Sequence, residues 1–342
     1  MKTTMKDIAR ELDISVTAVS KSLNDADDIS PDLKRRVRQK ARELNYYRDH
    51  VARKLASPRT YTLGAFMFSR STKVIDISYK FLNGVLEEAN DSRYDIILFS
   101  LDAGLLEEKS CIELCRERQV EGAIFTGLTG DHPQLDEIRK SELPTAVIDT
   151  RVKGENNYFI SSNNEGGVRL GMQYLWQELG HRNIALLTGP PETYVMQQRW
   201  QGYKEFLSEK GGYEEDLVFH GDFSRESGYS QGADIASLPA DRRPTAIFAL
   251  SDVLAAGASR AVQEAGLKVP EDISILGFDD VAICEFVDPA LTTIGQNADS
   301  VGRAAARAII DHLQGDPPDG DGIFIDVELV KRESCFYLTK KK

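Results

Sequence analysis

The sequence contains few residues that could hold a metal ion or build a disulfide framework. It has four cysteines and five histidines in 342 residues. Cys111 and Cys115 stand one helical turn apart, Cys284 and Cys335 are isolated, and no Cys-x-x-Cys pair or nearby histidine completes a set of four ligands. Because a tetrahedral zinc site needs four such ligands and a secreted disulfide scaffold needs more cysteines, we expect no metal, no disulfide and a reducing compartment.

Long apolar runs are also absent. Residues 1–10 have no apolar signal core, and stretches such as Ile96–Phe99 are far shorter than the roughly 18 residues of a membrane helix. Hydrophobic residues make up 41% of the chain and charged residues 28%, so packed cores are expected. We expect a soluble, cytoplasmic protein of two or three domains with no membrane partner.

The sequence lacks the glycine-rich loops that bind dinucleotides or triphosphates, G-x-G-x-x-G after a strand and G-x-x-x-x-G-K-[ST]. Gly228–Gly232 formally fits the G-x-S-x-G nucleophile motif, but the polar residues 224–227 replace the strand that must precede it, and the segment is typical of a helix. Its downstream histidine would have to be His312. The other histidines form no cluster, and we expect neither an enzyme nor a cofactor.

Charge is distributed unevenly along the chain. Residues 1–60 contain fourteen Lys/Arg and nine Asp/Glu, a net charge of +5, whereas the remaining 282 residues contain 28 basic and 45 acidic residues, a net charge of -17. A basic N-terminal part on an acidic remainder indicates a polyanionic partner for the basic part alone. The alternative is chance clustering in solvated helices.

The first 45 residues predict three short helices. Met5, Ile8, Ala9 and Leu12 have helical spacing, and Thr4 and Asp7 form a plausible capping pair. A turn at residues 13–15 leads to a second helix over 16–23, and Ser30-Pro31 begins a third. The expected core is Ala9, Ile14, Val19, Leu23, Val37 and Leu44.

The second helix exposes small and basic side chains, namely Val16, Thr17, Ser20, Lys21 and Asn24. Short side chains allow a helix to approach the major groove of DNA closely, and Lys21 can donate to guanine acceptors. A generic three-helix bundle with a polar exterior is the alternative.

Residues 5–10, 14–24, 29–31 and 44–46, followed by Val51–Leu55, resemble the headpiece of the lactose-repressor family, and the resemblance extends over nearly the whole chain. It implies that Val16, Thr17 and Lys21 read bases. It also implies that Ser15, Ser20 and Asn24 contact phosphate.

The resemblance further implies a hinge helix over 49–57 that lies in the minor groove of DNA. In this segment Arg53 is a DNA contact and Leu55 is the apolar wedge that kinks the duplex. The usual Pro-Asn of the hinge is Arg48-Asp49 here. A less rigid hinge start, and repulsion between Asp49 and phosphate, are expected from this change.

From Tyr61 onward, short apolar runs alternate with amphipathic stretches, which predicts parallel sheets covered by helices on both faces. The predicted strands are 63–68, 96–99, 123–125, 146–148, 184–187, 246–250 and 273–276. The predicted helices are 79–89, 107–118, 165–178, 199–210, 253–265 and 301–313.

The fold class is therefore α/β, with an all-α helix-turn-helix headpiece. The resemblance implies a core of two lobes like that of periplasmic binding proteins. The predicted domains are a headpiece (1–47), a hinge helix or linker (48–60) and an effector-binding and dimerisation domain (61–342). We expect an N-lobe of about 61–162 and 292–320, and a C-lobe of about 163–291 and 321–342.

Ligands of open parallel sheets bind beyond the carboxyl ends of the strands, which favours Asp149, Ser251 and Asp279 as site residues. Residues 276–280 are similar to a family signature whose first aspartate, here Asp279, grips effector hydroxyls. The resemblance also places Arg199 in the cleft and Phe223 against the effector ring. Asp149, Ser69 and Gln296 are candidates for the other wall. The alternatives are turn or capping roles for the polar residues and a core role for Phe223.

Together these features predict a bacterial transcription regulator, and we expect a repressor of carbohydrate metabolism genes. We expect it to bind a pseudo-palindromic operator as a homodimer and to respond to a small sugar-like effector. The chain carries no appended leucine heptad that would make a tetramer. The alternatives are a purine- or phosphosugar-responsive corepressed regulator, and a sugar-binding module without specific DNA regulation.

Overall fold

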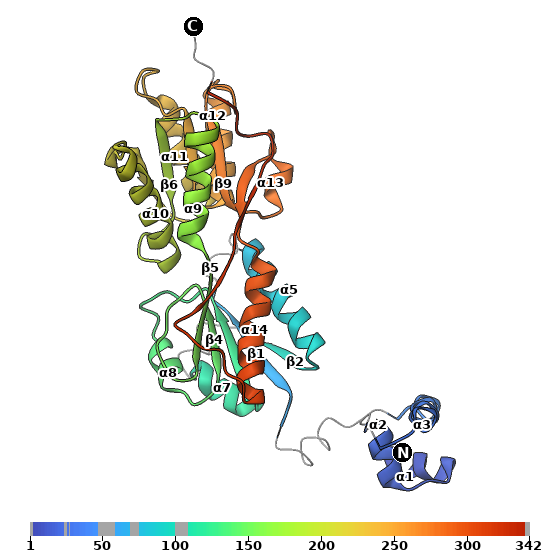
Figure 1. Ribbon diagram of the computed structural model, residues 1–342. Coiled ribbons are helices and arrows are strands. Elements are labelled where there is room, and N and C mark those ends of the chain that lie inside the picture. Colours follow the sequence, from blue (N-terminus) through green and yellow to red (C-terminus); the bar gives the residue numbers. More distant parts are fainter. Residues whose placement is uncertain are drawn as a thin grey trace. The chain divides into compact units, whose positions relative to one another are not determined.

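The computed structural model describes residues 3–23, 26, 28–46, 59–68, 75–99 and 109–338. The chain divides into two compact units, Met1–Thr60, here called the head, and Tyr61–Lys342, here called the body (Figure 1). Among the described residues, none of the helices combines the length and the apolar character that a membrane span requires.

The described residues of the head form three helices, α1 (Met5–Leu12), α2 (Val16–Leu23) and α3 (Pro31–Glu43). The predicted caps are present: the Thr4 backbone N–H donates to Asp7 Oδ2 at 2.9 Å, and Ser30 Oγ accepts from the Leu33 N–H at 3.3 Å. The core is as predicted from the helical spacing. Ile8, Ala9, Val19, Val37 and Ala41 are buried, and Ile14, Leu23 and Leu44 pack against them.

The N-lobe of the body is a six-stranded parallel sheet. Its strands, in spatial order, are β11 (Ile323–Ile325), β5 (Asn157–Ser162), β4 (Thr145–Ile148), β3 (Gly122–Thr126), β1 (Thr62–Met67) and β2 (Asp95–Phe99). Helices α5 (Ile75–Asp91) and α14 (Ala298–Gln314) share one apolar core with the sheet. Helices α7 (Cys111–Arg118) and α8 (Leu135–Lys140) share a second core with alternate strand residues. The sheet is therefore covered on both faces.

The C-lobe repeats this plan around a second six-stranded sheet. In spatial order its strands are β12 (Glu328–Val330), β10 (Thr292–Gly295), β9 (Ser274–Asp279), β8 (Ala246–Ala249), β6 (Ile184–Thr188) and β7 (Val218–His220), of which only β12 is antiparallel to its neighbour. One face carries α9 (Asn164–Gln173), a π-helical turn (Tyr174–Glu178) and α10 (Tyr194–Lys210). The other carries α11 (Arg225–Ser237) and α12 (Asp252–Glu264). Short helices Glu215–Leu217 and α13 (Ile283–Phe286) complete the lobe. The predicted fold class, with doubly wound sheets, is confirmed.

Within the described residues the chain passes between the lobes three times, after β5, after β10 and after β11. The predicted lobe boundaries were wrong by one strand each. Thr292–Gly295 pairs with β9 in the C-lobe, and Ile323–Ile325 pairs with β5 in the N-lobe. The reason is that these crossing strands are only four and three residues long, so the sequence pattern does not mark which sheet completes their hydrogen bonding.

Two predicted helices begin elsewhere because capping side chains set their first turns. Helix α10 starts at Tyr194, five residues before the predicted Arg199, since Thr193 Oγ1 accepts from the Met196 N–H. Helix α7 starts at Cys111 rather than at residue 107, since Ser110 caps it. Thus Arg199 lies in the second turn of a helix rather than at its start.

Helices α5 and α14 approach each other closely at two glycines. A Cβ atom at Gly84 would stand 1.9 Å from the Asp299 carbonyl oxygen, and one at Gly302 would stand 1.9 Å from the Phe81 carbonyl oxygen. Only glycine permits this backbone contact. The two helices therefore form a closely packed layer over the N-lobe sheet.

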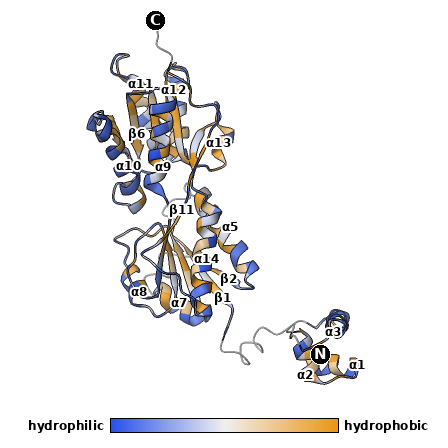
Figure 2. Cartoon of the chain, in the orientation of Figure 1, coloured by the Kyte–Doolittle hydropathy of each residue, from blue (hydrophilic) through white to orange (hydrophobic). Residues whose placement is uncertain are grey.

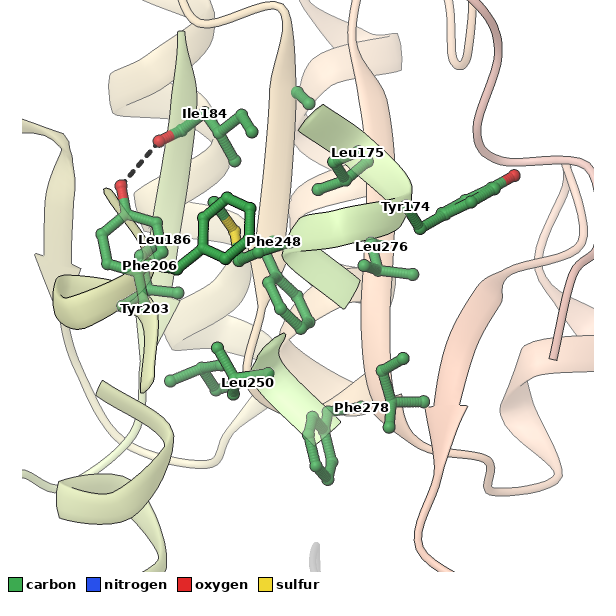
Figure 3. Packing of buried hydrophobic residues seen from close by; sticks show 14 of the residues in the cluster. Tyr174, Leu175, Ile184, Leu186, Tyr203, Phe206, Phe248, Leu250, Leu276 and Phe278 are labelled. Atoms are coloured by element: carbon green, nitrogen blue, oxygen red, sulfur yellow. Dashed lines mark hydrogen bonds between the residues drawn. The ribbon is translucent and has the colours of Figure 1, made fainter. Parts of the chain in front are cut away.

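Aromatic side chains fill much of the C-lobe core between the sheet and α9 and α10 (Figure 3). Phe206, Phe248 and Phe278 are almost completely buried, and the Tyr203 hydroxyl donates to the Ile184 carbonyl oxygen at 2.8 Å. Burial of one such ring stabilises the fold by about 1.5–3 kcal/mol. Coloured by hydropathy, the strands are predominantly apolar and the exposed helix faces are polar (Figure 2). This core holds the strand ends that carry the site.

Candidate functional site

The exposed face of α2 carries the residues that the sequence analysis assigned to DNA. Ser15, Val16, Thr17 and Lys21 are exposed, and Ser20 is half-buried. Ser15 Oγ accepts from the Ala18 N–H at 3.1 Å, so this side chain also caps α2. Lys21 Nζ forms an ion pair with Asp28 in the segment after α2. The described part of the predicted base-reading surface is therefore continuous along one helix.

The body contains a cavity of about 410 Å³ between its two lobes. Phe68, Ile77, Phe81, Leu128, Ile148 and Asp149 are among the N-lobe residues that line it. Thr193, Arg199, Phe223, Ser251, Asp279 and Gln296 line it from the side of the C-lobe and the crossing segment after β10. Six of the seven predicted effector-site residues are thereby brought to one cavity.

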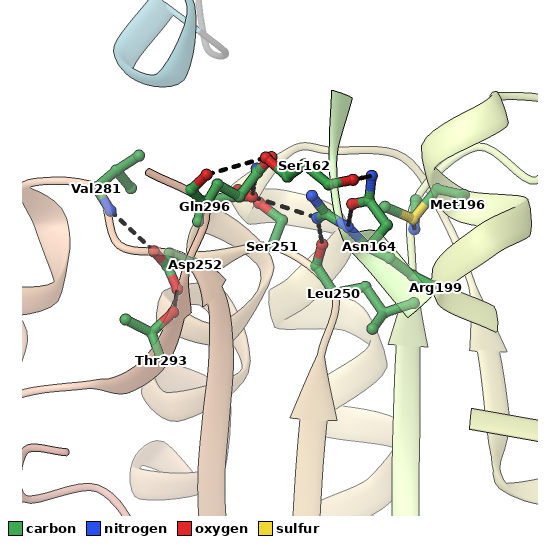
Figure 4. A network of polar contacts seen from close by, with 12 residues as sticks. Ser162, Asn164, Met196, Arg199, Leu250, Ser251, Asp252, Val281, Thr293 and Gln296 are labelled. Atoms are coloured by element: carbon green, nitrogen blue, oxygen red, sulfur yellow. Dashed lines mark hydrogen bonds and ion pairs between the residues drawn. The ribbon is translucent and has the colours of Figure 1, made fainter. Parts of the chain in front are cut away.

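Arg199 lies at the polar end of this cavity and is only 2% exposed. Its Nε donates to Asn164 Oδ1 at 2.7 Å, and its Nη1 donates to the Leu250 carbonyl oxygen at 2.7 Å and to Asp279 Oδ1 at 3.2 Å (Figure 4). Its guanidinium carbon also stands 3.7 Å from the centre of the Phe278 ring. The guanidinium thus ties α9, β8 and β9 together at the edge of the sheet.

Two carboxylates of the cavity stand on strained backbone at strand ends. Asp279 ends β9 with φ of 125°, and Asp149 follows β4 with φ of 62°. Residues with side chains seldom adopt these angles, and such strain is concentrated at functional sites. The backbone therefore holds both carboxylates in defined positions at the carboxyl edges of the two sheets.

Both of these carboxylates are buried. Burial raises the pKa of Asp149, and the hydrogen bond from Ser161 Oγ at 2.6 Å opposes that shift. Burial raises the pKa of Asp279 as well, while the neighbouring Arg199 lowers it. Gln296 Nε2 donates to the same Asp279 oxygen as Arg199. A ligand hydroxyl that donated to Asp279 would therefore meet an acceptor already oriented by two fixed donors.

A further carboxylate, Asp252, was missed by the sequence analysis. It is completely buried at the first residue of α12, where its Oδ2 accepts from the Val281 N–H at 3.0 Å and its Oδ1 accepts from Thr293 Oγ1 at 2.5 Å. Burial and the charge of Asp279 raise the pKa of Asp252 to about 7. Because Val281 follows the strained Asp279-Asp280 pair, Asp252 fixes the segment that carries the Asp279 carboxylate (Figure 4).

Asn164 was also missed, although it is 3% exposed and accepts the Arg199 Nε–H. It stands two residues after the end of β5, which is a signal the strand-end rule could have used once β5 was recognised. Ser251 lines the cavity and also caps α12, where its Oγ accepts from the Val253 N–H at 3.3 Å. A place in the cavity and a capping role are thus compatible for this residue. Phe223 lines the cavity and packs on the backbone of Gly189.

Some predicted site residues lie outside the described residues. These are Asn24, Arg53, Leu55 and Ser69, together with the Arg48-Asp49 pair. The G-x-S-x-G run at Gly228–Gly232 lies within α11, as expected from its polar surroundings. Where the chain is described, no group of three or more His, Cys, Asp or Glu residues is placed to hold a metal ion.

Comparison with known proteins matches both units. Residues 4–49 match the bacterial regulatory proteins of the lacI family, and residues 172–335 match the periplasmic binding protein-like domain. The HTH-type transcriptional repressor CytR of Escherichia coli is 30% identical over 337 residues, which cover 97% of this chain and 96% of that protein. The chain belongs to the lacI family of bacterial regulatory proteins. The resemblance seen in the headpiece motifs is thereby confirmed.

Solved structures of lacI-family proteins share the fold over the full length. A lac repressor dimer bound to operator and an anti-inducer covers 98% of this chain and 100% of its own, with 25% identity and a TM-score of 0.78. The complex of the transcriptional regulator CelR with cellobiose covers 97% of this chain and 100% of its own, with 26% identity and a TM-score of 0.71. Each of these two structures thus covers both the head and the body of this chain.

Proposed function

We propose that the protein is a transcription repressor that binds a pseudo-palindromic operator as a homodimer and is controlled by a small saccharide held between the lobes of its body. The observation that carries this proposal is the pairing of a helix-turn-helix head with a cavity lined by strand-end carboxylates. The function is binding rather than catalysis, and it would be exerted in the cytoplasm, where the chromosome lies. The test is selection from a random pool of duplexes, which should enrich one two-fold symmetric sequence.

In the DNA complex, α2 would lie in the major groove. Val16, Thr17 and Lys21 would face base edges, while Ser15 and Ser20 would contact phosphate oxygens. Asn24, Arg53 and Leu55 are proposed contacts on the resemblance alone. The acidic body would be repelled by DNA, so specific attachment would rest on the basic head.

The surface of α5 supports a homodimer. Tyr79, Leu82 and Leu86 follow helical spacing along this helix, with Tyr79 59% and Leu86 46% exposed, and Leu98 on the edge strand β2 is 53% exposed. Exposed apolar stripes of this kind mark interaction surfaces. A two-fold axis through this stripe, here called the α5 stripe, would bury it against its own copy and match the symmetry of the operator.

The C-lobe contributes to the same side of the body. Lys80 Nζ, on α5, donates to the Asp280 carbonyl oxygen at 2.5 Å, and α13 begins three residues after Asp280 (Figure 1). Phe286 on α13 is 83% exposed. The interface would therefore span both lobes, so a change in lobe orientation would alter the dimer. Ligand that bound one orientation more tightly would shift the population toward it.

The charge of the cavity favours an unphosphorylated ligand. Among the described residues that line it, Asp149, Glu192, Asp222 and Asp279 carry carboxylates, and Arg199 is the cation. Arg199 already donates to three acceptors inside the protein. A phosphate group would enter without a free positive partner, which is costly in a buried site. Neutral hydroxyls can donate to the carboxylates, and the structure of CelR with cellobiose offers a precedent in the family.

Calorimetric titration tests this ligand class. We expect at least one neutral saccharide among cellobiose, glucose and ribose to bind, and we expect glucose 6-phosphate to bind at least about tenfold more weakly than glucose, because the added dianion meets four carboxylates. Tighter binding of the phosphorylated sugar would contradict the charge argument. Binding of adenine or hypoxanthine in place of every saccharide would favour the purine alternative.

A further inference from the structure

The ion pair between Lys21 and Asp28 stands on the surface that the proposed function assigns to DNA. Lys21 Nζ contacts Asp28 Oδ2, and the two side chains are 48% and 56% exposed. Lys21 is the one cation in the sequence of α2, Val16–Leu23. Lys21 carries the only ammonium group that α2 can offer to a base edge or a phosphate. Asp28 already accepts a hydrogen bond from that group.

Two backbone hydrogen bonds connect described residues near Asp28 to the end of α2. The Ala26 N–H donates to the Lys21 carbonyl oxygen at 3.1 Å, and the Ile29 N–H donates to the Ala26 carbonyl oxygen at 3.3 Å. These two bonds join Ala26 to Lys21, and Ile29 to Ala26. The residue that follows Asp28 is thus linked to Lys21 through two backbone hydrogen bonds.

Asp28 is charged when it meets DNA. The hydrogen bond from Lys21 is the main reason that the pKa of Asp28 is lowered, and Lys34 adds a smaller attraction. A phosphate that approaches Lys21 must therefore displace this carboxylate from the ammonium. A guanine edge must displace the same carboxylate, but it brings directional acceptors for the freed ammonium.

We propose that Asp28 is a specificity-determining residue of the DNA interface, which competes with DNA for Lys21 and so weakens attachment to sequences that lack the matching base pair. Non-specific binding rests almost wholly on contacts between cations and phosphates, so the loss of one cation weakens it most. Specific binding retains its base contacts. The inference rests on the proposed function, since it assumes that α2 faces DNA.

The test compares full-length wild type with Asp28→Asn on two duplexes of equal length, the sequence selected by the wild type and a scrambled version. Asp32→Asn is the matched control, because it removes the same charge from the head, where Asp32 pairs with Arg35 on α3. We expect Asp28→Asn to tighten binding to the scrambled duplex by about 3- to 10-fold. The dependence of this affinity on salt concentration should become steeper, by about one released counterion for each head. Asp32→Asn should leave the ratio of the two affinities within about twofold.

A double-mutant cycle shows whether the effect acts through Lys21. In a Lys21→Met background, Asp28→Asn should change neither affinity by more than about twofold. Thermal unfolding of each variant verifies that the head stays folded.

Three results would overturn the inference. Equal effects of Asp28→Asn and Asp32→Asn on the affinities would show that only the net charge of the head matters. A loss of affinity for the selected duplex in Asp28→Asn would mean that Asp28 supports Lys21 instead of competing for it. If Asp28→Asn still changed the affinities in the Lys21→Met background, Asp28 would act without Lys21. Failure of the wild type to select any duplex is a separate outcome, which contradicts the proposed function itself.

Discussion

Arg199→Ala should lower the free energy of unfolding of the body by about 3–5 kcal/mol, as expected when one partner of a buried ion pair is removed. The substitution would leave Asp279 without its cation in a buried position. It would also leave the Asn164 side-chain oxygen and the Leu250 carbonyl without a donor. Urea unfolding followed by circular dichroism measures the change.

Arg169→Ala is the matched control for this prediction. Arg169 lies on α9 in the same lobe and pairs with Glu209 at 3.3 Å, but both side chains are about half exposed, at 49% and 51%. Exposed pairs contribute about 0–1 kcal/mol. Equal stability of Arg199→Ala and Arg169→Ala would contradict the structural role. If Arg199 served only to contact ligand, the substitution would instead abolish the ligand response while leaving stability near normal.

The second large effect concerns the α5 stripe. Leu86→Lys places a charge in the middle of the proposed two-fold interface and should convert the dimer to a monomer in sedimentation experiments. A monomer contacts only one half of a symmetric operator, so the affinity for the selected duplex should fall at least about 100-fold, because the second contact is no longer intramolecular. The body of the monomeric variant should still fold, because Leu86 is half-exposed and contributes little to the core.

Ser208→Lys on α10 provides the comparison, since it adds the same charge at an exposed polar position of the C-lobe. This variant should remain dimeric and bind the duplex as the wild type does. A dimeric Leu86→Lys protein with unchanged affinity would show that the copies meet at another surface.

The elements that sequence reasoning predicted well are those whose signals are local. Continuous apolar runs marked β3, β4, β6 and β8, and capping residues marked the three helices of the head. Strand β5 and the short crossing strands β10, β11 and β12 were not predicted. Strands β5, β10 and β12 mix polar and apolar residues, and β11 is only three residues long. The place of β11 is fixed by pairing with β5, which is distant in the chain.

The candidate site shows the same division. Asp149, Ser251 and Asp279 were predicted because each directly follows or ends an apolar strand, where parallel sheets present their ligands. Asn164 and Asp252 were not predicted, because their roles depend on contacts with Arg199, Val281 and Thr293 that only the folded chain brings together. The burial of Arg199 among internal acceptors was likewise invisible in the sequence, which indicated only its position near the cleft.

The most direct test of the account is the affinity of the full-length protein for its selected symmetric duplex and for a scrambled one, measured with and without a saturating saccharide. We expect the symmetric duplex to bind at least about 1,000-fold more tightly. We expect the saccharide to change that affinity by at least about fivefold. Equal affinity for the two duplexes, whichever saccharide is present, would contradict the account.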